Sequence, residues 1–108
     1  KADLRGVDLS ETDLRGAVFN NSLLNGTDLR GANMKDVLAY STDFDEADLR
    51  DANLSNALLM ESSFTNAKIE GADFSEAIIN RIQQKQLCAR AEGTNSISGT
   101  TTLYSLGC

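Results

Sequence analysis

Large apolar residues recur at every fifth position from residue 4 to residue 79. We call these sixteen positions the centre positions; fifteen of them hold a large apolar residue, and the exception is Ala39. The fifteen are Leu4, Leu9, Leu14, Phe19, Leu24, Leu29, Met34, Phe44, Leu49, Leu54, Leu59, Phe64, Ile69, Phe74 and Ile79. Two places before every centre position stands a small or short residue: nine Ala, three Thr, two Ser and two Val. Residues 1–80 are therefore one five-residue unit written sixteen times.

A period of five fits neither an α-helix, which needs apolar residues about every 3.6 positions, nor a β-strand, which alternates at every second position. Over eighty residues a helix would spread the centre positions around its whole circumference. A solenoid satisfies the pattern, because each unit can form one side of a coil with its centre side chain turned inward. Stacked coils pair their backbones at about 4.8 Å, as in a parallel sheet. We therefore expect an all-β solenoid whose interior is a ladder of the fifteen centre side chains.

The residues on either side of the centre positions indicate how many units make one coil. They face solvent in this arrangement and most are polar, but seven are large and apolar. Six of the seven belong to the units centred on residues 19, 39, 59 and 79, which recur every twenty residues. These six, which we call the apolar stripe, are Val18, Leu38, Tyr40, Leu58, Met60 and Ile78. We infer four units per coil, a square cross-section, about four coils, and a fourth face (the outer side of those four units) that carries the apolar stripe.

The corners between units fall two residues after each centre position. Five of the eight glycines lie there, and glycine permits the positive φ that a type II turn needs. Asparagine, at residues 21, 56 and 66, tolerates this geometry better than most residues, whereas glutamate, at residues 11, 46, 61 and 76, does not. We therefore expect corners of mixed type.

Residues 47–56 show the unit most clearly, as Ala-Asp-Leu-Arg-Asp followed by Ala-Asn-Leu-Ser-Asn. This run, and residues 1–80 as a whole, resembles the pentapeptide-repeat family, whose unit reads Ala, Asp or Asn, Leu and two variable residues. The resemblance implies a right-handed quadrilateral β-helix, in agreement with the four-unit coil inferred from the apolar stripe. Besides Ala39, the chain departs from the family pattern where an apolar or basic residue replaces Asp or Asn: Val18, Leu23, Leu38, Leu58, Lys68 and Ile78.

Residues 81–108 form a second segment after the repeat domain of residues 1–80. Residues 81–92 are rich in helix formers, with Asn80 placed to cap the first turn and Gly93 to end the helix. A solenoid needs a cap over its last open coil, and this helix is placed to supply one. We expect Ile82 and Leu87 to be the buried residues that plug the end of the coil.

The only two cysteines, Cys88 and Cys108, both lie in this second segment. Such a pair suggests a disulfide bond and an oxidising compartment, and the alternative is two free thiols in a reducing one. We expect the bond to hold residues 94–108 beside the helix, where they cover part of the fourth face near Leu58 and Ile78. The apolar stripe is then a partner surface, or is covered by this tail or by a segment upstream of Lys1. Lys1 is already in phase with the repeat, so we expect a processed form or a fragment.

The amino-acid composition argues against several classes of function. The chain has no His, so no Ser–His or Cys–His pair exists, and we predict that it is not an enzyme. A formal net charge of −6 argues against direct nucleic-acid binding, and no apolar run approaches the length of a membrane span. We expect a monomer that binds no cofactor.

One column of aspartates is a candidate cation site. Asp8, Asp28 and Asp48 stack on one face, and stacked carboxylates can hold a hard cation such as Ca²⁺. Basic residues on the same face, Arg30, Arg50 and Lys68, can neutralise the column by pairing between coils. We therefore predict no metal site.

The end of the chain carries a narrower resemblance. Gly-Thr-Asn at residues 93–95 and Ser-Leu-Gly-Cys at residues 105–108 resemble the C-terminal segment of pentapeptide-repeat proteins of the thylakoid lumen in plants and cyanobacteria. This implies location in the chloroplast thylakoid lumen. A cyanobacterial lumen or periplasm is the alternative, or the cytosol if the disulfide is absent.

Three functions fit these observations. We interpret the chain as a non-enzymatic protein–protein interaction or structural module whose partner the sequence does not name. The first alternative is an acidic mimic of duplex DNA that binds DNA gyrase, as some pentapeptide-repeat proteins do; residues 1–80 hold 15 acidic and 7 basic residues. The second is a redox-responsive regulator of the lumen in which the disulfide bond is reversibly reduced.

Overall fold

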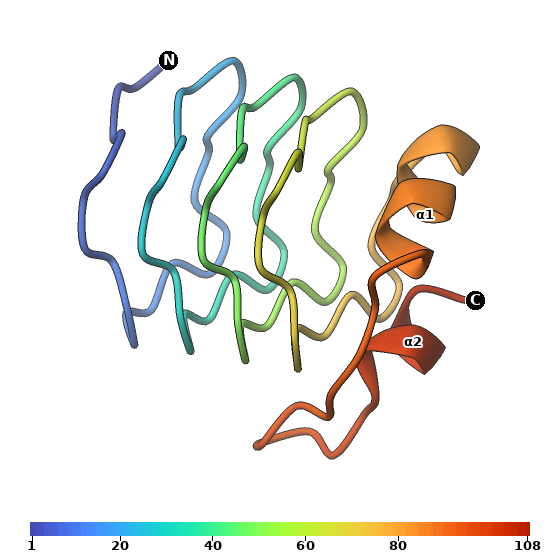
Figure 1. Cartoon of the computed structure of the whole chain (residues 1–108). Helices are drawn as coiled ribbons and strands as arrows, with labels where there is room; N and C mark the ends of the chain where they lie inside the picture. The colour runs from blue at the N-terminus through green and yellow to red at the C-terminus, as the bar shows by residue number, and fades with distance from the viewer.

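The chain folds as a solenoid of stacked coils with two short helices at its C-terminal end (Figure 1). The structure is a computed structural model that describes all 108 residues. Twelve parallel backbone pairings join residues exactly one coil apart, from Asp3 with Leu23 to Leu58 with Ile78, and every pair is separated by twenty residues. The predicted coil of four units, and the four coils that follow from it, are therefore confirmed. Each pairing is one residue wide, because one corner lies two residues before the paired residue and the next lies three residues after it.

The centre positions form the core. Eleven of the fifteen predicted ladder residues are buried: Phe19, Leu24, Leu29, Met34, Phe44, Leu49, Leu54, Leu59, Phe64, Ile69 and Phe74. The remaining four, Leu4, Leu9, Leu14 and Ile79, are partly buried against this core in the first and last coils. Phe44 and Phe64 stack directly, with ring centroids 5.0 Å apart. Burial of each such side chain contributes about 1.5–3 kcal/mol, much of it offset by the ordering of the chain.

Serine and threonine replace alanine at some of the small positions because their hydroxyls find partners there. Thr27 donates a hydrogen bond to the carbonyl of Leu4, and Thr42 to that of Phe19. Ser62 does the same to Ala39. Each bond joins two consecutive coils, so a buried hydroxyl is satisfied and the stack gains a further link.

All fifteen corner residues from residue 6 to residue 76 have a positive φ, between 53° and 76°. The expectation of mixed corners is therefore wrong for the backbone: the four glutamates have the same positive φ as the glycines. The reason is the pairing between coils. Every corner N–H from residue 6 to residue 56 donates to a carbonyl of the next coil, as Glu11 does to Arg30 and Glu46 to Thr65, both at 2.8 Å. In the last coil, the residue before each corner accepts such a bond from the preceding coil. This ladder fixes the corner although each non-glycine residue in the left-handed region costs about 1–2 kcal/mol.

Helix α1 (Arg81–Cys88) lies over the end of the last coil. Asn80 caps it as predicted, and the caps are reciprocal: the Gln83 N–H donates to Asn80 Oδ1 and the Asn80 N–H donates to Gln83 Oε1, both at 2.8 Å. The helix ends at Cys88, four residues before the predicted end.

Only one of the two predicted plugging residues is buried. Leu87 is 1% exposed, as expected, but Ile82 is 70% exposed, and that prediction is wrong. Gln83 takes the inward position, and its Nε2 donates to the carbonyls of Leu59 and Ser62, both at 2.8 Å. Residues four apart share a helix face, whereas residues five apart do not, so burying Leu87 selects Gln83 rather than Ile82.

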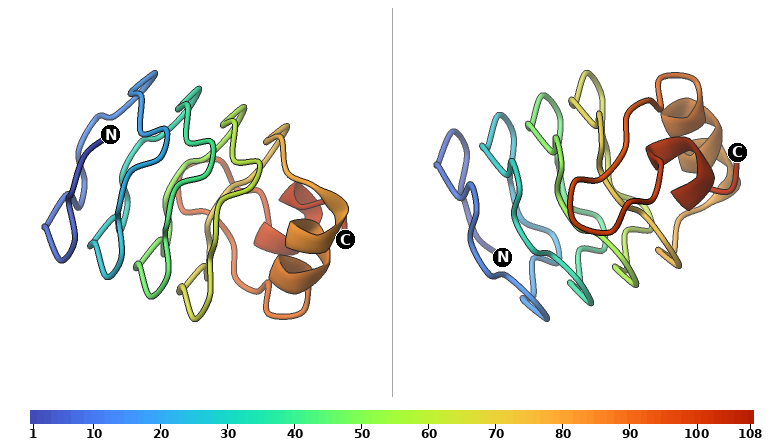
Figure 2. Two further views of the ribbon diagram at one scale, coloured as in Figure 1. Left: turned by 90° about the horizontal axis from the view of Figure 1, so that it is seen from above. Right: turned by 90° about the horizontal axis from the view of Figure 1, so that it is seen from below.

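The tail, residues 93–108, follows the corner between the second and third faces, whose units are centred on 9, 29, 49 and 69 and on 14, 34, 54 and 74 (Figure 2). The Asn95 side-chain amide donates to the carbonyls of Gly71 and Ala52 at 3.0 and 3.3 Å, and the Gly71 N–H donates to the Glu92 carbonyl at 2.9 Å. A Cβ on Gly93 would lie 2.8 Å from the Gly71 nitrogen. Two glycines thus permit this close backbone approach.

The predicted position of the tail over the fourth face is wrong, because this contact draws the tail to another side of the coil. Ile78 remains 51% exposed. Helix α2 (Thr102–Ser105) ends at the third face, where Ser105 Oγ accepts a hydrogen bond from the Phe74 N–H at 2.9 Å. The predicted disulfide bond between Cys88 and Cys108 is present and joins the end of α1 to the end of the chain. Neither helix has the length and apolar character needed to cross a bilayer.

Met34→Asp places an unpaired carboxylate in the core ladder, and Lys35→Asp changes the neighbouring exposed residue. We expect the first change to lower the free energy of unfolding by about 3–5 kcal/mol and the second by less than about 0.5 kcal/mol. Urea denaturation followed by circular dichroism measures both. Equal midpoints for the two variants would refute the assignment of inward and outward positions.

Reduction of the disulfide bond should loosen the tail and leave the coils intact. The bond closes a loop of twenty residues, and its loss should destabilise that segment by about 3 kcal/mol. Hydrogen exchange should then become faster for the amides of residues 94–107 and stay unchanged for those of residues 24–54. A Cys88→Ser, Cys108→Ser double variant is the control and should match the reduced protein. Unchanged exchange in the tail would show that the bond does not hold it.

Candidate functional site

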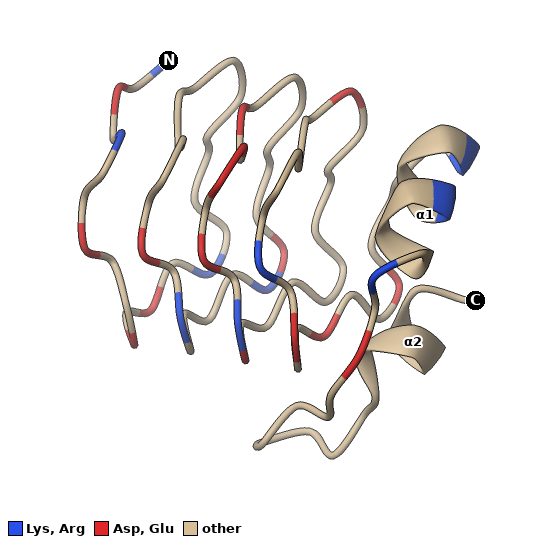
Figure 3. Ribbon diagram, viewed as in Figure 1, with Lys and Arg blue, Asp and Glu red and all other residues tan.

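The four faces of the solenoid differ in charge. The outward positions of the fourth face, residues 18, 20, 38, 40, 58, 60, 78 and 80, include no charged residue. On each of the other three faces, the outward positions (the residues just before and just after a centre position) include both acidic and basic residues. Figure 3 shows these charges gathered along part of the coil circumference, while other stretches of backbone are free of them. The fourth face is therefore distinguished by lack of charge as well as by its apolar side chains.

The structure brings the six residues of the apolar stripe together on the outside of that face. Val18, Leu38, Leu58 and Ile78 form one column, since each pairs its backbone with the next. Val18 is 63% exposed, Leu38 40%, Tyr40 45% and Ile78 51%, whereas Leu58 and Met60 are half-buried. Paired strands lie about 4.8 Å apart, so these side chains form a continuous apolar surface on a rigid support. Such a surface is typical of a binding site for another macromolecule.

Five exposed apolar residues lie outside this face and were not predicted as surface residues: Val7, Ile82, Ile97, Leu103 and Tyr104. Ile82 projects from α1, and Ile97 and Tyr104 project from the tail, where both are more than four-fifths exposed. The tail reads as polar in sequence, and nothing in its spacing separates residues that pack from residues that do not.

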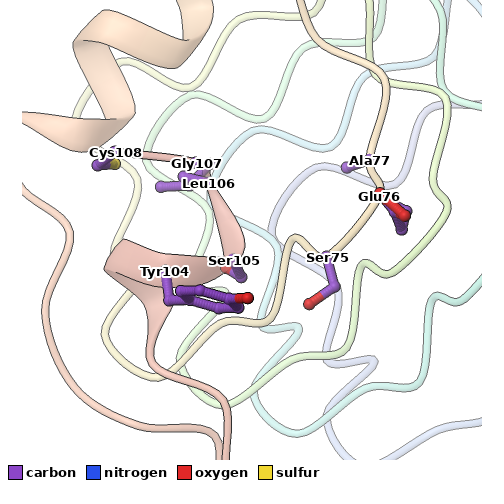
Figure 4. A pocket seen from close by; sticks show the side chains of 8 residues that line it. All are labelled: Ser75, Glu76, Ala77, Tyr104, Ser105, Leu106, Gly107 and Cys108. Carbon is purple, nitrogen blue, oxygen red and sulfur yellow. The ribbon is translucent and has the colours of Figure 1, made fainter.

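A second surface feature also lies outside the predicted site. The end of the tail and the last third-face unit enclose an open hollow of about 770 Å³ (Figure 4). Its lining residues are Ser75, Glu76, Ala77, Tyr104, Ser105, Leu106, Gly107 and Cys108. It forms because α2 is bonded to the last coil at Phe74 and projects beyond it. The hollow is wide and open, and its lining holds one acidic side chain, Glu76, and no Lys, Arg or His.

The charges of the second face are paired mainly within units rather than between coils. Arg30 Nη2 lies 2.7 Å from Asp28 Oδ2, and Arg50 Nη2 lies 2.6 Å from Asp48 Oδ2. The predicted pairing between coils is limited to one contact, Arg30 Nε to Asp48 Oδ2 at 3.9 Å, and Lys68 forms no ion pair. The reason is spacing, because residues two apart on one extended unit lie on the same side of it. No cluster of acidic residues, His or Cys in the structure is arranged to hold a metal ion.

Hydrogen bonds from Arg30 hold the pKa of Asp28 at about 2, below the ordinary value of 3.8. The pKa of Asp48 is lowered by Arg50 in the same way. Ion pairs this exposed contribute little to stability, and salt screens them. These pairs neutralise carboxylates that would otherwise repel each other along the column.

Stability should depend on pH through Asp28. Its pKa is lower in the folded chain than in the unfolded one, so its contribution is present above about pH 4 and is lost as the pH falls through 2. Asp28→Asn should therefore flatten the decrease in melting temperature between pH 5 and pH 2. Asp36→Asn, at an exposed corner aspartate without an ion pair, serves as the control and should retain the wild-type slope. Identical slopes for both variants and the wild type would contradict this role.

Comparison with known proteins gives a consistent result. A family model described as Pentapeptide repeats matches residues 1–37 and 42–81, in eight copies. No curated protein matches the chain. Among solved structures, the chain is similar to AT2G44920, a pentapeptide repeat protein from the thylakoid lumen of Arabidopsis thaliana. The two are 31% identical with a TM-score of 0.59, over 99% of this chain and 88% of that one.

Two further similar structures come from cyanobacteria. HetL, a pentapeptide repeat protein involved in heterocyst differentiation regulation in Nostoc sp. strain PCC 7120, is 33% identical over 70% of this chain, with a TM-score of 0.45. The chain covers only 34% of HetL. Rfr23 from Cyanothece 51142, also a pentapeptide repeat protein, is 22% identical over 72% of this chain, with a TM-score of 0.33.

Proposed function

The chain belongs to the pentapeptide-repeat family, and from this premise we propose that it is a non-enzymatic interaction module of the thylakoid lumen that binds a protein partner through the apolar stripe. The family predicted from the five-residue unit is thereby confirmed. Proteins of this family form right-handed β-helices and generally serve as structural or interaction modules. The proposal assigns this chain the second of these roles.

The observation that carries the proposal is the exposure of the apolar stripe. The face is uncharged, its apolar side chains are held in fixed register by backbone pairing, and the tail lies against other faces. Burial of apolar surface is the main favourable term in protein association, and a rigid surface loses little conformational entropy on binding. A role in recognition accounts for these six residues better than stability does, because they contribute little to the core.

The available side chains support a role without catalysis. The chain has no His, and both cysteines are joined in the disulfide bond. The acidic side chains closest to a basic group form ion pairs with arginine at the surface of the coils. None of these groups provides a nucleophile beside a general base.

Two observations support the thylakoid lumen. The similar protein AT2G44920 comes from that compartment, and the likeness extends over nearly the whole of this chain. A disulfide bond persists in oxidising compartments and is rare in reducing ones.

We assign α1 and the tail the role of the C-terminal cap. The last coil has no following coil, so the N–H and C=O groups that would pair with one need other partners. Gln83 supplies a donor to Ser62, Glu92 an acceptor to Gly71, and Ser105 an acceptor to Phe74. Covering this edge protects the solenoid from pairing end to end with other chains.

A photo-crosslinking amino acid at Leu38 tests the interaction surface. We expect it to form discrete adducts in isolated thylakoid lumen, identified by mass spectrometry, whereas the same probe at Thr65 on the first face (units centred on 4, 24, 44 and 64) should not. Leu38→Gln should reduce the affinity for the identified protein at least about tenfold, which is typical for an important interface residue. The same adducts from both positions would show that the fourth face is not the contact surface.

The DNA-mimic alternative stays a prediction. It requires a regular array of free negative charges, yet Asp3, Asp13, Asp28 and Asp48 each pair with an arginine at 2.6–2.8 Å. These four pairs interrupt such an array, while the other eleven acidic residues of residues 1–80 form no ion pair. Redox regulation through the disulfide bond likewise stays a prediction.

A further inference from the structure

Two rows of corner residues border the fourth face. One row consists of residues 16, 36, 56 and 76, and the other of residues 21, 41 and 61, followed by Arg81 at the start of α1. Three carboxylates stand in these rows, on Asp36, Glu61 and Glu76, and all three residues are exposed. We call these three carboxylates the acidic rim.

The acidic rim is not neutralised by the chain itself. None of the ion pairs in the structure involves Asp36, Glu61 or Glu76. Glu61 accepts one hydrogen bond, from the neutral Asn80 amide at 3.3 Å. The aspartates of the other faces differ in this respect, since Asp28 and Asp48 each have an arginine two residues away. The uncharged apolar face is thus bordered by three carboxylates without an ion pair and by one basic residue, Arg81.

Charge also varies along the axis. Residues 1–40 hold six acidic and five basic residues, whereas residues 41–80 hold nine acidic and only two basic ones. Two of the three carboxylates of the acidic rim, those of Glu61 and Glu76, belong to the second half. Beyond residue 80 the charge changes sign, because α1 contains Arg81 and Lys85 and no acidic residue, so the excess of negative charge is confined to residues 41–80.

From this arrangement we infer that the partner of the apolar stripe presents an apolar patch framed by Lys and Arg. This inference rests on the proposed function and names the chemistry of the partner at the same face. Apolar contact at the centre supplies affinity, while opposite charges at the rim speed association and reject acidic competitors. A second copy of this chain is a poor occupant, because it would bring the same acidic rim.

Two synthetic amphipathic peptides provide the probe. Both have the same leucine-rich face along an eighteen-residue helix; the residues flanking that face are Lys in one peptide and Glu in the other. Affinity is measured by isothermal titration calorimetry near 0.15 M salt, where the Debye length is about 8 Å and only charges close to the contact still act. We expect the Lys peptide to bind at least about tenfold more tightly than the Glu peptide. Leu38→Gln should weaken the binding of the Lys peptide.

Charge-reversed variants separate the acidic rim from the overall charge. The rim variant is Asp36→Lys, Glu61→Lys, Glu76→Lys, and the matched control is Glu11→Lys, Glu46→Lys, Glu70→Lys, which changes the net charge equally on other faces. The rim variant should reverse the preference between the two peptides. The control should change either affinity by less than about threefold. Circular dichroism establishes that both variants retain the fold.

The possible results distinguish this inference from the proposed function. Binding of neither peptide would overturn both. Equal binding of both peptides, lost in Leu38→Gln, would leave the interaction surface standing and overturn the basic partner. An equal loss in the rim variant and its control would assign the effect to net charge and overturn the inference. A dimer in sedimentation velocity that is abolished by Leu38→Gln would identify a second copy as the occupant and overturn it as well.

Discussion

Every feature of this molecule depends on the backbone pairing between residues twenty apart. Each coil offers the next one N–H and C=O groups at the sides and N–H groups at the corners. The centre residues add apolar contacts inside this stack and do not determine its path, since Ala39 occupies a centre position without interrupting it. The pairing also sets the corner conformation, which explains why glutamate, aspartate and serine adopt a positive φ that they disfavour elsewhere. The intrinsic preference of these residues for negative φ is overridden because a displaced corner would break a hydrogen bond to a neighbouring coil.

The C-terminal segment solves the problem that such a stack creates at its end. A further coil would supply hydrogen-bond partners for the N–H and C=O groups of the last coil through regular backbone pairing. The C-terminal segment supplies such partners through an irregular set of side chains and backbone groups. Gln83 is the clearest case, because a polar side chain lies where the sequence predicts an apolar one. Its amide meets carbonyls that a leucine would leave without partners, and a buried carbonyl without a partner costs about 1–3 kcal/mol. The disulfide bond then closes this region as one unit.

Residues 1–80 follow a repeated pattern and residues 81–108 do not, and this difference explains which features the sequence could predict. The core ladder, the square coil and the outward apolar stripe follow from periodicity. The pattern is repeated sixteen times, so a single unit that departs from it, such as the one with Ala39, does not obscure it. The path of the tail cannot be predicted from periodicity. It depends on single contacts, such as the approach of Gly93 to Gly71, that are not part of a repeated pattern. The same holds for Ile82 and Gln83, whose positions depend on how the helix rests on the coil. Of the candidate site, the members of the apolar stripe came from the pattern, but the lack of any cover over them came from the structure.

The square coil makes the length of an insertion matter more than its composition. Twenty added residues would lengthen the solenoid by one coil, about 4.8 Å, and keep every later residue on its own face. Five added residues preserve the unit equally well, yet they would turn everything beyond them by a quarter of a coil. The column from Val18 to Ile78 would then divide between two adjacent faces, with an intact core beneath it. An insertion of any multiple of five residues is therefore compatible with the fold. Only an insertion of a multiple of twenty residues also keeps the apolar side chains of the fourth face in one continuous column.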